Sequence, residues 1–376
     1  MLLNFADLRA QARRRLPRFV FDYLDGAAED ERCMQRNAAA LERLHLLPTC
    51  LRDTEHIDTA IEVFGERWAA PLGIAPIGLC GLVRPHGDVL LARAAAAAGL
   101  PFVLSTASNS RLEAVREAGR GAAQWLQLYV MGERAIAEQM VRRARAAGYG
   151  ALVLTVDVPV SGQRERDLRN GFALPLRPGP ALAIDVLRHP RWALGLARHG
   201  APRFVNLDAG ASASSAQAQA ALLTRTMDRR LDWASLAWLR GLWDGPLLLK
   251  GVLHPDDARR ALQHGVDGLV VSNHGGRQLD AAPATMDALP AVLDAVEARI
   301  PVFVDGGFRR GSDVVKALAL GAKAAFVGRP AAFALGGGGE AGVASMLQGL
   351  NDELQRTMAL IGAASIAAIE RGHLAR

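Results

Sequence analysis

The chain has 376 residues, half of them hydrophobic and 22% charged, which is enough to bury a large core in one or two domains. Its net charge of +6 suits an anionic ligand or an anionic membrane surface. Nucleic-acid binding has only that charge in its favour, because no segment interleaves basic and aromatic residues as a recognition surface would.

The three cysteines, Cys33, Cys50 and Cys80, have no CxxC spacing, so we expect free thiols in a reducing compartment and no metal site. Charged residues in 1–19 interrupt the apolar core that a signal peptide would need. The longest apolar run, residues 89–107, contains an arginine and a glycine, so no transmembrane helix is expected. These features predict a cytoplasmic protein.

Residues 1–70 are predicted to begin as helix and to form a cap, after which short apolar runs alternate with helical stretches, as in a parallel sheet. Eight βα units over ~260 residues are the expected size of a (β/α)8 TIM barrel. A doubly wound open sheet is the alternative, but its GxGxxG motif does not follow the first strand. The predicted strands are residues 71–76, 101–105, 125–129, 151–156, 246–250, 268–272, 301–305 and 324–328.

A long insertion, residues 158–232, separates the fourth predicted strand from the fifth. It is rich in Arg, Pro, Ala and Trp, and we expect it above the barrel mouth. The barrel itself would span residues 71–330, and residues 331–376 would form a helical C-terminal segment of the same single domain.

Polar residues and glycines follow nearly every predicted strand, at the end where barrel enzymes carry their chemistry. Any one of them is explained equally well as a helix cap or a solvated side chain, but their convergence on one rim favours a functional site. In chain order they are Pro76, Gly78, Ser105, Gln127, Tyr129, Thr155, Asp157, Lys250, Ser272, His274, Arg277, Asp305, Gly307, Arg309, Gly328 and Arg329.

The last two strands end in "VDGGFRRGSD" and "FVGRP", which combine glycine with arginine. Glycines let backbone N–H groups face a phosphate, and a guanidinium group holds it with two hydrogen bonds. A tight turn would explain the glycines but not Arg309 and Arg329 beside them. Because this end of a barrel commonly binds phosphate, the sequence predicts a phosphorylated cofactor.

His274 stands in "SNHGGRQLD", across the predicted rim from Asp157. A carboxylate that meets this imidazole would orient it and stabilise its protonated form, which is the logic of acid–base catalysis. Arg277 and Arg164 offer planar forks for a substrate carboxylate. Lys250 is a fixed cation for negative charge on a reduced ring. These residues suit removal of a proton next to a carboxylate.

With these residues the chain resembles the FMN-dependent α-hydroxy-acid dehydrogenases and oxidases, from "FDYLDGAAEDE" to the C-terminal helix. The motifs "SNHGGRQLD", "DGGFRRGSDVVKALALGA", "QLYV" and "LTVDVPVSGQRERD" carry the resemblance. It implies FMN as cofactor and oxidation of an (S)-2-hydroxy acid, of the lactate or mandelate type, to the 2-oxo acid. It also implies a homo-oligomer, as the family often forms tetramers.

The resemblance further implies a role for each matching position. His274 would be the base and Asp157 its partner, with Tyr129 beside them. The substrate would contact Tyr23, Tyr129, Arg164, His274 and Arg277. FMN would contact Pro76, Ile77, Gly78, Ser105, Gln127, Thr155, Lys250, Ser272, Asp305, Gly306, Gly307, Arg309, Gly328 and Arg329.

Two features favour a membrane-associated dehydrogenase, on the inner face of the cell membrane with a quinone or other acceptor, over a soluble oxidase that makes hydrogen peroxide. Gly78 stands where the resembling oxidases carry alanine. Residues 173–204 place apolar side chains, Trp192 among them, between arginines, which suits contact with anionic lipid. An ordinary basic loop explains this segment equally well, and a non-catalytic basic binding protein is a third possibility. The arginines are Arg177, Arg188, Arg191, Arg198 and Arg203, against the single acid Asp185.

Overall fold

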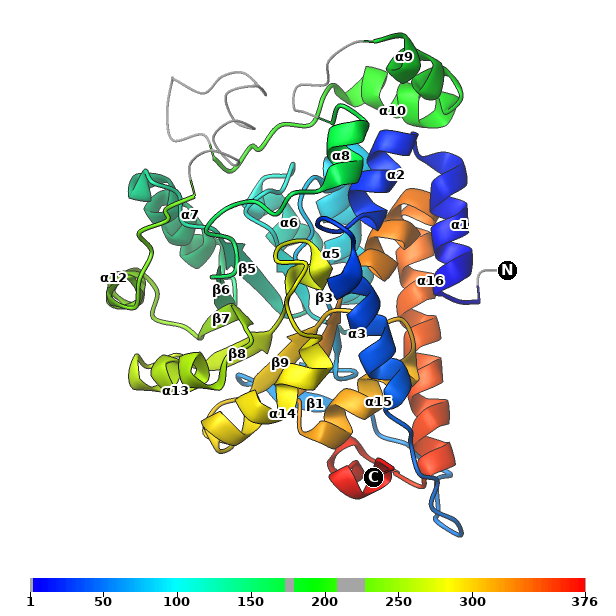
Figure 1. The fold of residues 1–376 in the computed structure, drawn as a ribbon, viewed down its shortest axis with the longest axis vertical. Helices are drawn as coiled ribbons and strands as arrows, with labels where there is room; N and C mark the ends of the chain where they lie inside the picture. Colours follow the sequence, from blue (N-terminus) through cyan, green and yellow to red (C-terminus); the bar gives the residue numbers. More distant parts are fainter. Residues whose placement is uncertain (1–2, 173–178, 208–226, 376) are drawn as a thin grey trace.

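The computed structural model describes residues 3–172, 179–207 and 227–375. Eight parallel strands close into a barrel, which confirms the predicted TIM-barrel fold (Figure 1). Every predicted strand has its counterpart, with ends that differ by at most two residues. They are β3 (Leu72–Ile74), β4 (Phe102–Leu104), β5 (Gln124–Leu128), β6 (Ala151–Thr155), β7 (Leu247–Val252), β8 (Gly268–Val271), β9 (Val302–Asp305) and β10 (Ala324–Val327).

Helices cover the outside of the barrel, so the strands are buried almost throughout and read as continuous apolar runs. The helices that return the chain from one strand to the next are α5 (Gly87–Ala97), α6 (Leu112–Ala118), α7 (Arg134–Ala147), α12 (Ala234–Leu242), α13 (Pro255–Gln263), α14 (Thr285–Val296) and α15 (Gly311–Leu320), while α16 (Arg329–Ile361) follows the last strand. Short α4 (Cys80–Val83) precedes α5.

Aromatic side chains fill the amino end of the barrel. The ring centroid of Trp125 lies 5.3 Å from that of Trp68 and 5.4 Å from that of Phe303. Trp68 comes from an antiparallel hairpin, β1 (Ile61–Val63) and β2 (Glu66–Trp68), which the sequence analysis did not predict. These rings close the amino end of the barrel.

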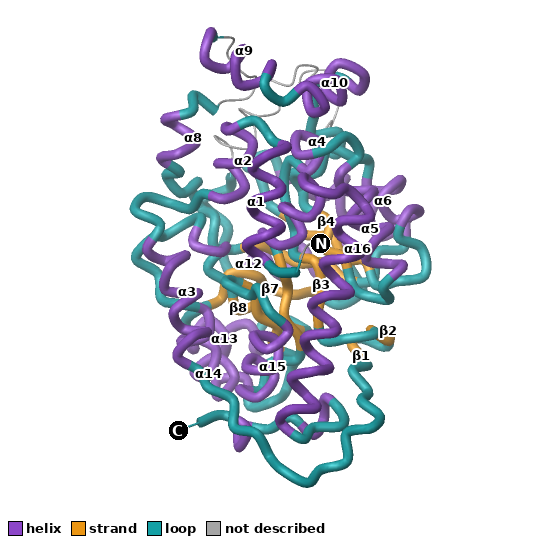
Figure 2. The backbone as a smooth tube through the Cα atoms, turned by 90° about the vertical axis from the view of Figure 1, so that its right-hand side faces the viewer, coloured by secondary structure: helices purple, strands orange, loops and turns teal. Residues whose placement is uncertain are grey.

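The N-terminal cap consists of α1 (Phe5–Arg15), α2 (Arg18–Asp25) and α3 (Arg32–Arg43). α1 lies along α16, so the first helix of the chain packs against its last long helix (Figure 2). Glycines make this close approach possible, because a Cβ atom would come within 2.7 Å of Leu16 at Gly336 and 2.5 Å of Gln11 at Gly337. The glycine run of α16 is therefore the surface against which α1 packs.

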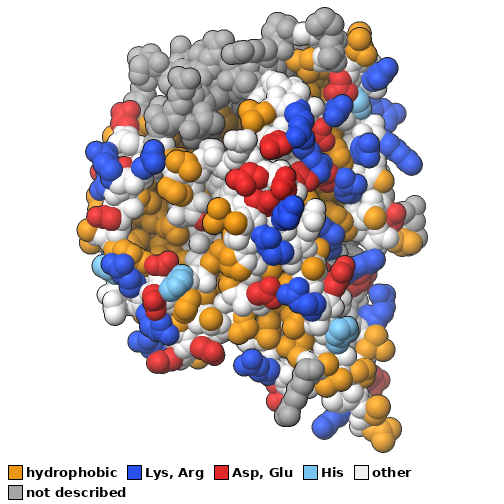
Figure 3. All heavy atoms as spheres, viewed as in Figure 1, with side chains coloured by type: hydrophobic (Ala, Val, Ile, Leu, Met, Phe, Trp, Pro, Cys, Tyr) orange, Lys and Arg blue, Asp and Glu red, His pale blue; other side chains and the backbone are white. Residues whose placement is uncertain are grey.

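The insertion after β6 carries α8 (Glu165–Arg169), α9 (Pro180–Leu187) and α10 (Pro190–His199), with α9 and α10 at the top of the molecule in Figure 1. Lys and Arg side chains gather on the neighbouring surface, with a few acidic ones between them (Figure 3). Of the five arginines predicted to face lipid, Arg188, Arg191, Arg198 and Arg203 are exposed, whereas Arg177 lies outside the described residues.

The prediction that Trp192 faces lipid is wrong. Its side chain is buried, its Nε1 donates to the carbonyl of Leu82 at 2.8 Å, and its ring meets that of Phe19 at 5.7 Å. The aromatic ring with one polar atom finds both an apolar surface and an acceptor inside the protein. Among the described residues, no helix is long and apolar enough to cross a membrane.

Candidate active site

A cavity of about 870 Å³ opens at the carboxyl ends of the barrel strands, a size typical of ligand sites. The N-terminal cap and the insertion contribute to its wall. All but two of the predicted site residues line it. The exceptions, Asp157 and Ser272, stand behind the wall and are hydrogen-bonded to His274 and Lys250, which line it.

His274 is held from both sides of its ring. Its Nδ1 lies 3.1 and 3.2 Å from the two carboxylate oxygens of Asp157, and its Nε2 lies 3.2 Å from the hydroxyl of Tyr129. The residue has a φ of +58°, in the left-handed region that side chains with a Cβ rarely adopt. Such strain at a cavity wall is typical of functional positions.

Electrostatics fix the protonation of the neighbours of His274. Burial alone would raise the pKa of Asp157, but the charge of His274, the hydrogen bond from it and the charge of Lys250 hold that pKa below its usual range. Burial and the nearby Asp157 carboxylate raise the pKa of Tyr129. Asp157 is therefore an anion and Tyr129 a protonated hydroxyl at neutral pH.

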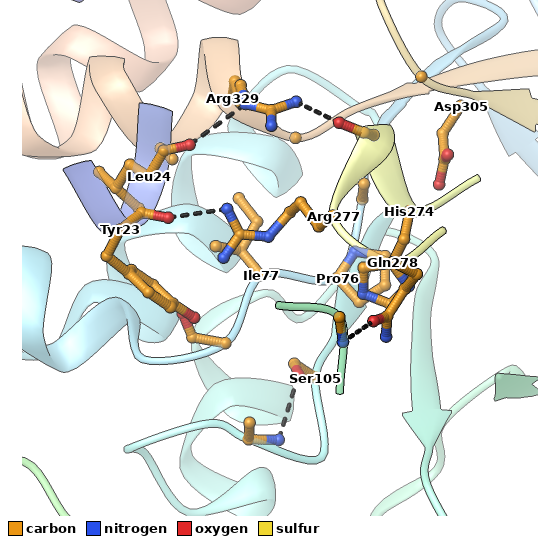
Figure 4. Close-up of a pocket in the computed structure, with 18 of the residues that line it drawn as sticks. Tyr23, Leu24, Pro76, Ile77, Ser105, His274, Arg277, Gln278, Asp305 and Arg329 are labelled. Atoms are coloured by element: carbon orange, nitrogen blue, oxygen red, sulfur yellow. Dashed lines mark hydrogen bonds between the residues drawn. The ribbon is translucent and has the colours of Figure 1, made fainter. Parts of the chain in front are cut away.

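Two guanidinium groups stand on one wall of the cavity. Arg277 and Arg164 lie 5.0 and 5.8 Å from the centre of the Tyr23 ring. Arg277 donates to the backbone carbonyls of Tyr23 at 2.7 Å and Gly26 at 3.1 Å, and Figure 4 shows it reaching toward the former. Burial and the charge of Arg164 lower the pKa of Arg277. Arg164 is only partly buried, and its Nε donates to the carboxylate of Asp167 at 2.8 Å. Arg277 has no such acidic partner in the described part of the chain, so an anionic ligand would supply its counter-charge.

A buried network lies behind the centre of the cavity. Lys250, only 4% exposed, donates to the hydroxyl of Ser272 at 2.8 Å and lies 3.2 Å from the carboxylate of Asp305. Ser272 donates to the same carboxylate at 2.6 Å and accepts from the backbone N–H of His274 at 3.0 Å. The network thus fixes a cation beside the loop that carries His274.

Gln127 ties three strand ends together. Its Nε2 donates to the hydroxyl of Thr155 at 3.0 Å, and its Oε1 accepts from the hydroxyl of Ser105 at 3.3 Å and from the backbone of Thr106 at 3.1 Å. Sequence reasoning missed Thr106, which is fully buried and donates to the carbonyl of Gln127 at 2.7 Å. Its place directly after Ser105 was the available signal.

The far end of the cavity is cationic. Arg329 donates to three carbonyls, those of Leu24 at 3.2 Å, Gly26 at 2.9 Å and Gly275 at 2.8 Å, and burial lowers its pKa to about 9 (Figure 4). The side chain of Arg309 has no hydrogen bond or ion pair within the described part of the chain. This free guanidinium, beside the glycines after β9, fits a phosphate group.

Apolar side chains of the insertion also line the cavity, and sequence reasoning did not single them out. The ring of Phe172 lies 5.3 Å from that of Tyr23, next to the guanidinium pair. Val158, Leu168 and Met227 line the same cavity. Irregular segments such as these carry no periodic pattern from which their contacts could be predicted.

Comparison with known proteins places these features in a family. The family model described as FMN-dependent dehydrogenase matches residues 12–376. The chain is 44% identical over 373 residues to (S)-mandelate dehydrogenase of Pseudomonas putida, covering 99% of this chain and 94% of the relative. It is 41% identical over 374 residues to glycolate oxidase 1 of Zea mays, covering 99% and 95%.

A solved structure is similar over the whole fold. The crystal structure of the monotopic membrane protein (S)-mandelate dehydrogenase superposes with a TM-score of 0.96 at 44% identity, covering 100% of this chain and 99% of that one.

Proposed function

Because the chain belongs to the FMN-dependent dehydrogenase family, we propose that it oxidises an (S)-2-hydroxy acid of the mandelate or lactate type and passes the electrons to a quinone or another membrane acceptor. FMN-dependent oxidation of an α-hydroxy acid is the activity common to its relatives. A non-catalytic binding protein is thereby excluded. The observation that carries the finer proposal is the His274–Asp157 pair, which shares one cavity with two arginines.

Substrate binding falls to Arg277 and Arg164. Each planar guanidinium group can donate two parallel hydrogen bonds to a carboxylate. Arg164 is already paired with Asp167 at 2.8 Å, so the bound carboxylate is the counter-charge mainly of Arg277. The hydroxyl of the substrate is then left to Tyr129 and His274, whose polar atoms are 3.2 Å apart.

Proton transfer falls to His274. Asp157 occupies its Nδ1 side, so Nε2 is the nitrogen that accepts a proton from the substrate. The ionised Asp157 stabilises the imidazolium that forms. Tyr129 remains protonated and donates to the substrate oxygen. In one route His274 accepts the proton from C2 of the substrate. In the other route the C2 hydrogen leaves as hydride and His274 accepts the proton of the hydroxyl group. Both routes use the same base.

FMN, when bound in this cavity, would supply the acceptor for the two electrons that leave the substrate. The residues lining the cavity fit it, since a free guanidinium and glycine-flanked backbone stand at one end and a buried cation in the middle. We propose that the flavin ring is bound by Pro76, Ile77, Gly78, Ser105, Gln127, Thr155, Lys250 and Ser272. Ser272 would act through its hydrogen bond with Lys250. We assign the ribityl phosphate to Asp305, Gly306, Gly307, Arg309, Gly328 and Arg329.

The wall beside the guanidinium pair favours a substrate with a bulky apolar side chain. Phe172 contacts Tyr23 there, and Leu168 and Val158 line the same cavity. Burial of an aryl group against such side chains stabilises binding by about 25 cal/mol for each Å² removed from water. Mandelate is therefore preferred over lactate and glycolate.

A turnover screen with a dye acceptor tests the activity and the preference together. We expect (S)-mandelate to have the highest kcat/KM among mandelate, lactate, glycolate and longer 2-hydroxy acids. Phe172→Ala should raise KM for mandelate more than for lactate. Glycolate as the best substrate would contradict the preference, and no flavin reduction by any 2-hydroxy acid would contradict the activity.

Membrane association is supported by the α9–α10 surface. Ile184, Leu187 and Leu194 are 51%, 78% and 57% exposed, and exposed arginines stand among them. Apolar side chains with interleaved cations suit an anionic lipid surface, where each cation contributes about 1 kcal/mol. A relative of high similarity is described as a monotopic membrane protein. We propose a peripheral homotetramer on the inner face of the cell membrane.

Gly78 supports a dehydrogenase over an oxidase. A Cβ atom there would lie 3.1 Å from that of Ala107 and 3.5 Å from the hydroxyl of Tyr23, which donates to the Gly78 carbonyl at 3.3 Å. Alanine would therefore crowd the wall beside the flavin. The second candidate function, a soluble oxidase producing hydrogen peroxide, is favoured by the similarity to glycolate oxidase.

The fate of the electrons separates the two candidates. Reduced enzyme should transfer electrons rapidly to a soluble quinone analogue and slowly to oxygen, and Gly78→Ala should raise the rate with oxygen. Salt or detergent should release the protein from the membrane fraction of a lysate. Rapid peroxide production by a wholly soluble wild-type protein would favour the oxidase.

A further inference from the structure

The aromatic ring of Phe5, at the start of α1, stands against the cationic end of the cavity. The guanidinium carbon of Arg309 lies 4.4 Å from the centre of this ring, close enough for a cation–π interaction. Phe5 lines the main cavity and also a small adjoining cavity of about 40 Å³. The ring thus forms part of the partition behind Arg309.

Arg309 depends on this ring because little else holds its side chain. Its backbone N–H donates to Asp313 at 2.9 Å, but its guanidinium group makes no hydrogen bond or ion pair with any residue that the structure describes. Burial lowers the pKa of Arg309, and Asp313 offsets part of that effect. An arginine with four side-chain torsions needs a support if it is to present its fork to a ligand.

The position of Phe5 is itself fixed by the packing of α1 on α16. Its ring lies 5.5 Å from that of the fully buried Phe333. Asn4 caps α1 by accepting from the backbone of Asp7 at 3.0 Å. The glycines of α16 bring α1 close enough for this contact, as described above, so a feature far from the barrel rim determines where the ring stands.

We propose that Phe5 is a positioning residue of the cofactor site, whose ring holds the Arg309 guanidinium at the phosphate end of the cavity. Helix α1 then takes part in binding the phosphate of FMN, although it belongs to the cap and not to the barrel. This assignment rests on the proposed role of Arg309 as a phosphate ligand. It explains why a guanidinium group with no hydrogen bond or ion pair to any described residue faces an aromatic ring.

Comparing FMN with riboflavin, which is FMN without its phosphate, isolates the contribution of Phe5 to phosphate binding. The apoenzyme of the full chain is titrated with FMN and with riboflavin, and binding is followed by quenching of flavin fluorescence. Phe5→Leu should weaken FMN binding about threefold to tenfold, the size of a partly buried cation–π contact, and leave riboflavin binding unchanged. Phe5→Tyr, which keeps the ring, should bind FMN like the wild type.

Two further variants complete the cycle. Arg309→Met should remove most of the preference for FMN over riboflavin, and adding Phe5→Leu to it should cause no further loss. Phe21→Leu is the matched control, because Phe21 also packs in the cap and carries Arg9 at 5.4 Å but does not line the cavity. Phe21→Leu should lower the stability of the folded protein and keep the preference for FMN over riboflavin. Phe5→Met serves in place of Phe5→Leu if the latter does not fold.

Four results would overturn the assignment. Equal weakening of FMN and riboflavin by Phe5→Leu would mean that the ring only stabilises the cap. An undiminished effect of Phe5→Leu in the Arg309→Met background would mean that it acts without Arg309. If Arg309→Met kept the preference for FMN over riboflavin, neither Arg309 nor Phe5 would have a role in phosphate binding. If Arg309→Met lost that preference but Phe5→Leu bound FMN like the wild type, the role of Phe5 alone would be excluded.

Discussion

At the scale of the single residue, Arg277 does two things at once. It donates to the carbonyls of Tyr23 and Gly26, which holds the cap against the rim, and it presents the rest of its fork to the cavity. A lysine keeps the charge but cannot make both sets of hydrogen bonds. If Arg277 binds the substrate carboxylate as proposed, its planar fork and not its charge alone is the feature that matters.

Arg277→Lys should lower kcat/KM for the 2-hydroxy acid by roughly 10- to 100-fold, the range expected when a charge-assisted pair of hydrogen bonds is lost. The FMN content should stay that of the wild type. Steady-state kinetics and the flavin absorbance of the purified protein check both parts. Oxidation of a 2-hydroxy amide as fast as the free acid would show that no carboxylate is recognised.

A second residue, Asp88 in the first turn of α5, is wholly buried. It accepts from the backbone of Asn109 at 3.1 Å, while its other oxygen has no partner in the described ranges. Burial raises its pKa from 3.8 to about 6. The folded protein therefore favours the protonated form, and stability is lost as the pH rises through the folded pKa.

Asp88→Asn removes that titration. The free energy of unfolding of the variant, minus that of the wild type, should rise between pH 4 and pH 6 and stay constant above pH 6. The total rise should be roughly 3 kcal/mol, because each unit of pKa shift corresponds to about 1.4 kcal/mol. Urea unfolding of both proteins at several pH values measures the difference. A difference that does not change with pH would contradict the raised pKa.

At the scale of the element, the α9–α10 surface divides into two faces. Trp192 packs on Phe19 and Leu82 and anchors α10 to the cap, whereas Ile184, Leu187 and Leu194 are exposed. Removing the whole segment would uncover Phe19, so substitutions on the exposed face are the cleaner test of lipid contact.

The triple variant Ile184→Ser, Leu187→Ser, Leu194→Ser should leave the membrane fraction of a lysate while keeping its flavin and its turnover with a soluble acceptor. Trp192→Ala, the matched control on the opposite face, should lower Tm without releasing stable protein. Sedimentation with lipid vesicles that contain anionic lipid gives the same comparison in purified form. A triple variant that still sediments like the wild type would argue against lipid contact through this face.

The barrel strands could be predicted because their residues are buried on both faces and most of the strands have Gly or Pro next to one end. The β1–β2 hairpin could not, because its strands have three residues each and its turn, Phe64–Gly65, carries no distinctive Asn-Gly or Asp-Gly signal. Trp192 was misread for a related reason. Its neighbours in sequence are basic, and only the tertiary fold brings Leu82 and Phe19 against it.

The site shows the same division. Residues that follow strands, such as His274 and Asp157, were predictable since the barrel gathers strand ends at one rim. Phe5 and Phe172 were not, because they reach the cavity from the cap and the insertion, whose placement no period in the sequence specifies. Arg329 donates to three backbone carbonyls that only the tertiary fold brings together, so these hydrogen bonds could not be predicted either.

At the scale of the whole molecule, the fold confines the chemistry to one end. Aromatic side chains close the amino end of the barrel, while the cap and the insertion surround the other end and enclose the cavity of about 870 Å³. The base, the guanidinium pair and the cationic far end all face this one space. Helices α9 and α10 lie at the top of the molecule in Figure 1, next to the cap helices α1 and α2, which contribute side chains to the cavity wall.

Anaerobic mixing of the FMN-loaded enzyme with an excess of (S)-mandelate tests the central claim most directly, with flavin absorbance as the signal. The wild type should lose its yellow colour rapidly. His274→Gln should retain its FMN and be reduced slower by about 10²- to 10⁴-fold, the contribution of a general base. Reduction of His274→Gln at the wild-type rate would contradict the assignment of His274 as the residue that accepts the proton.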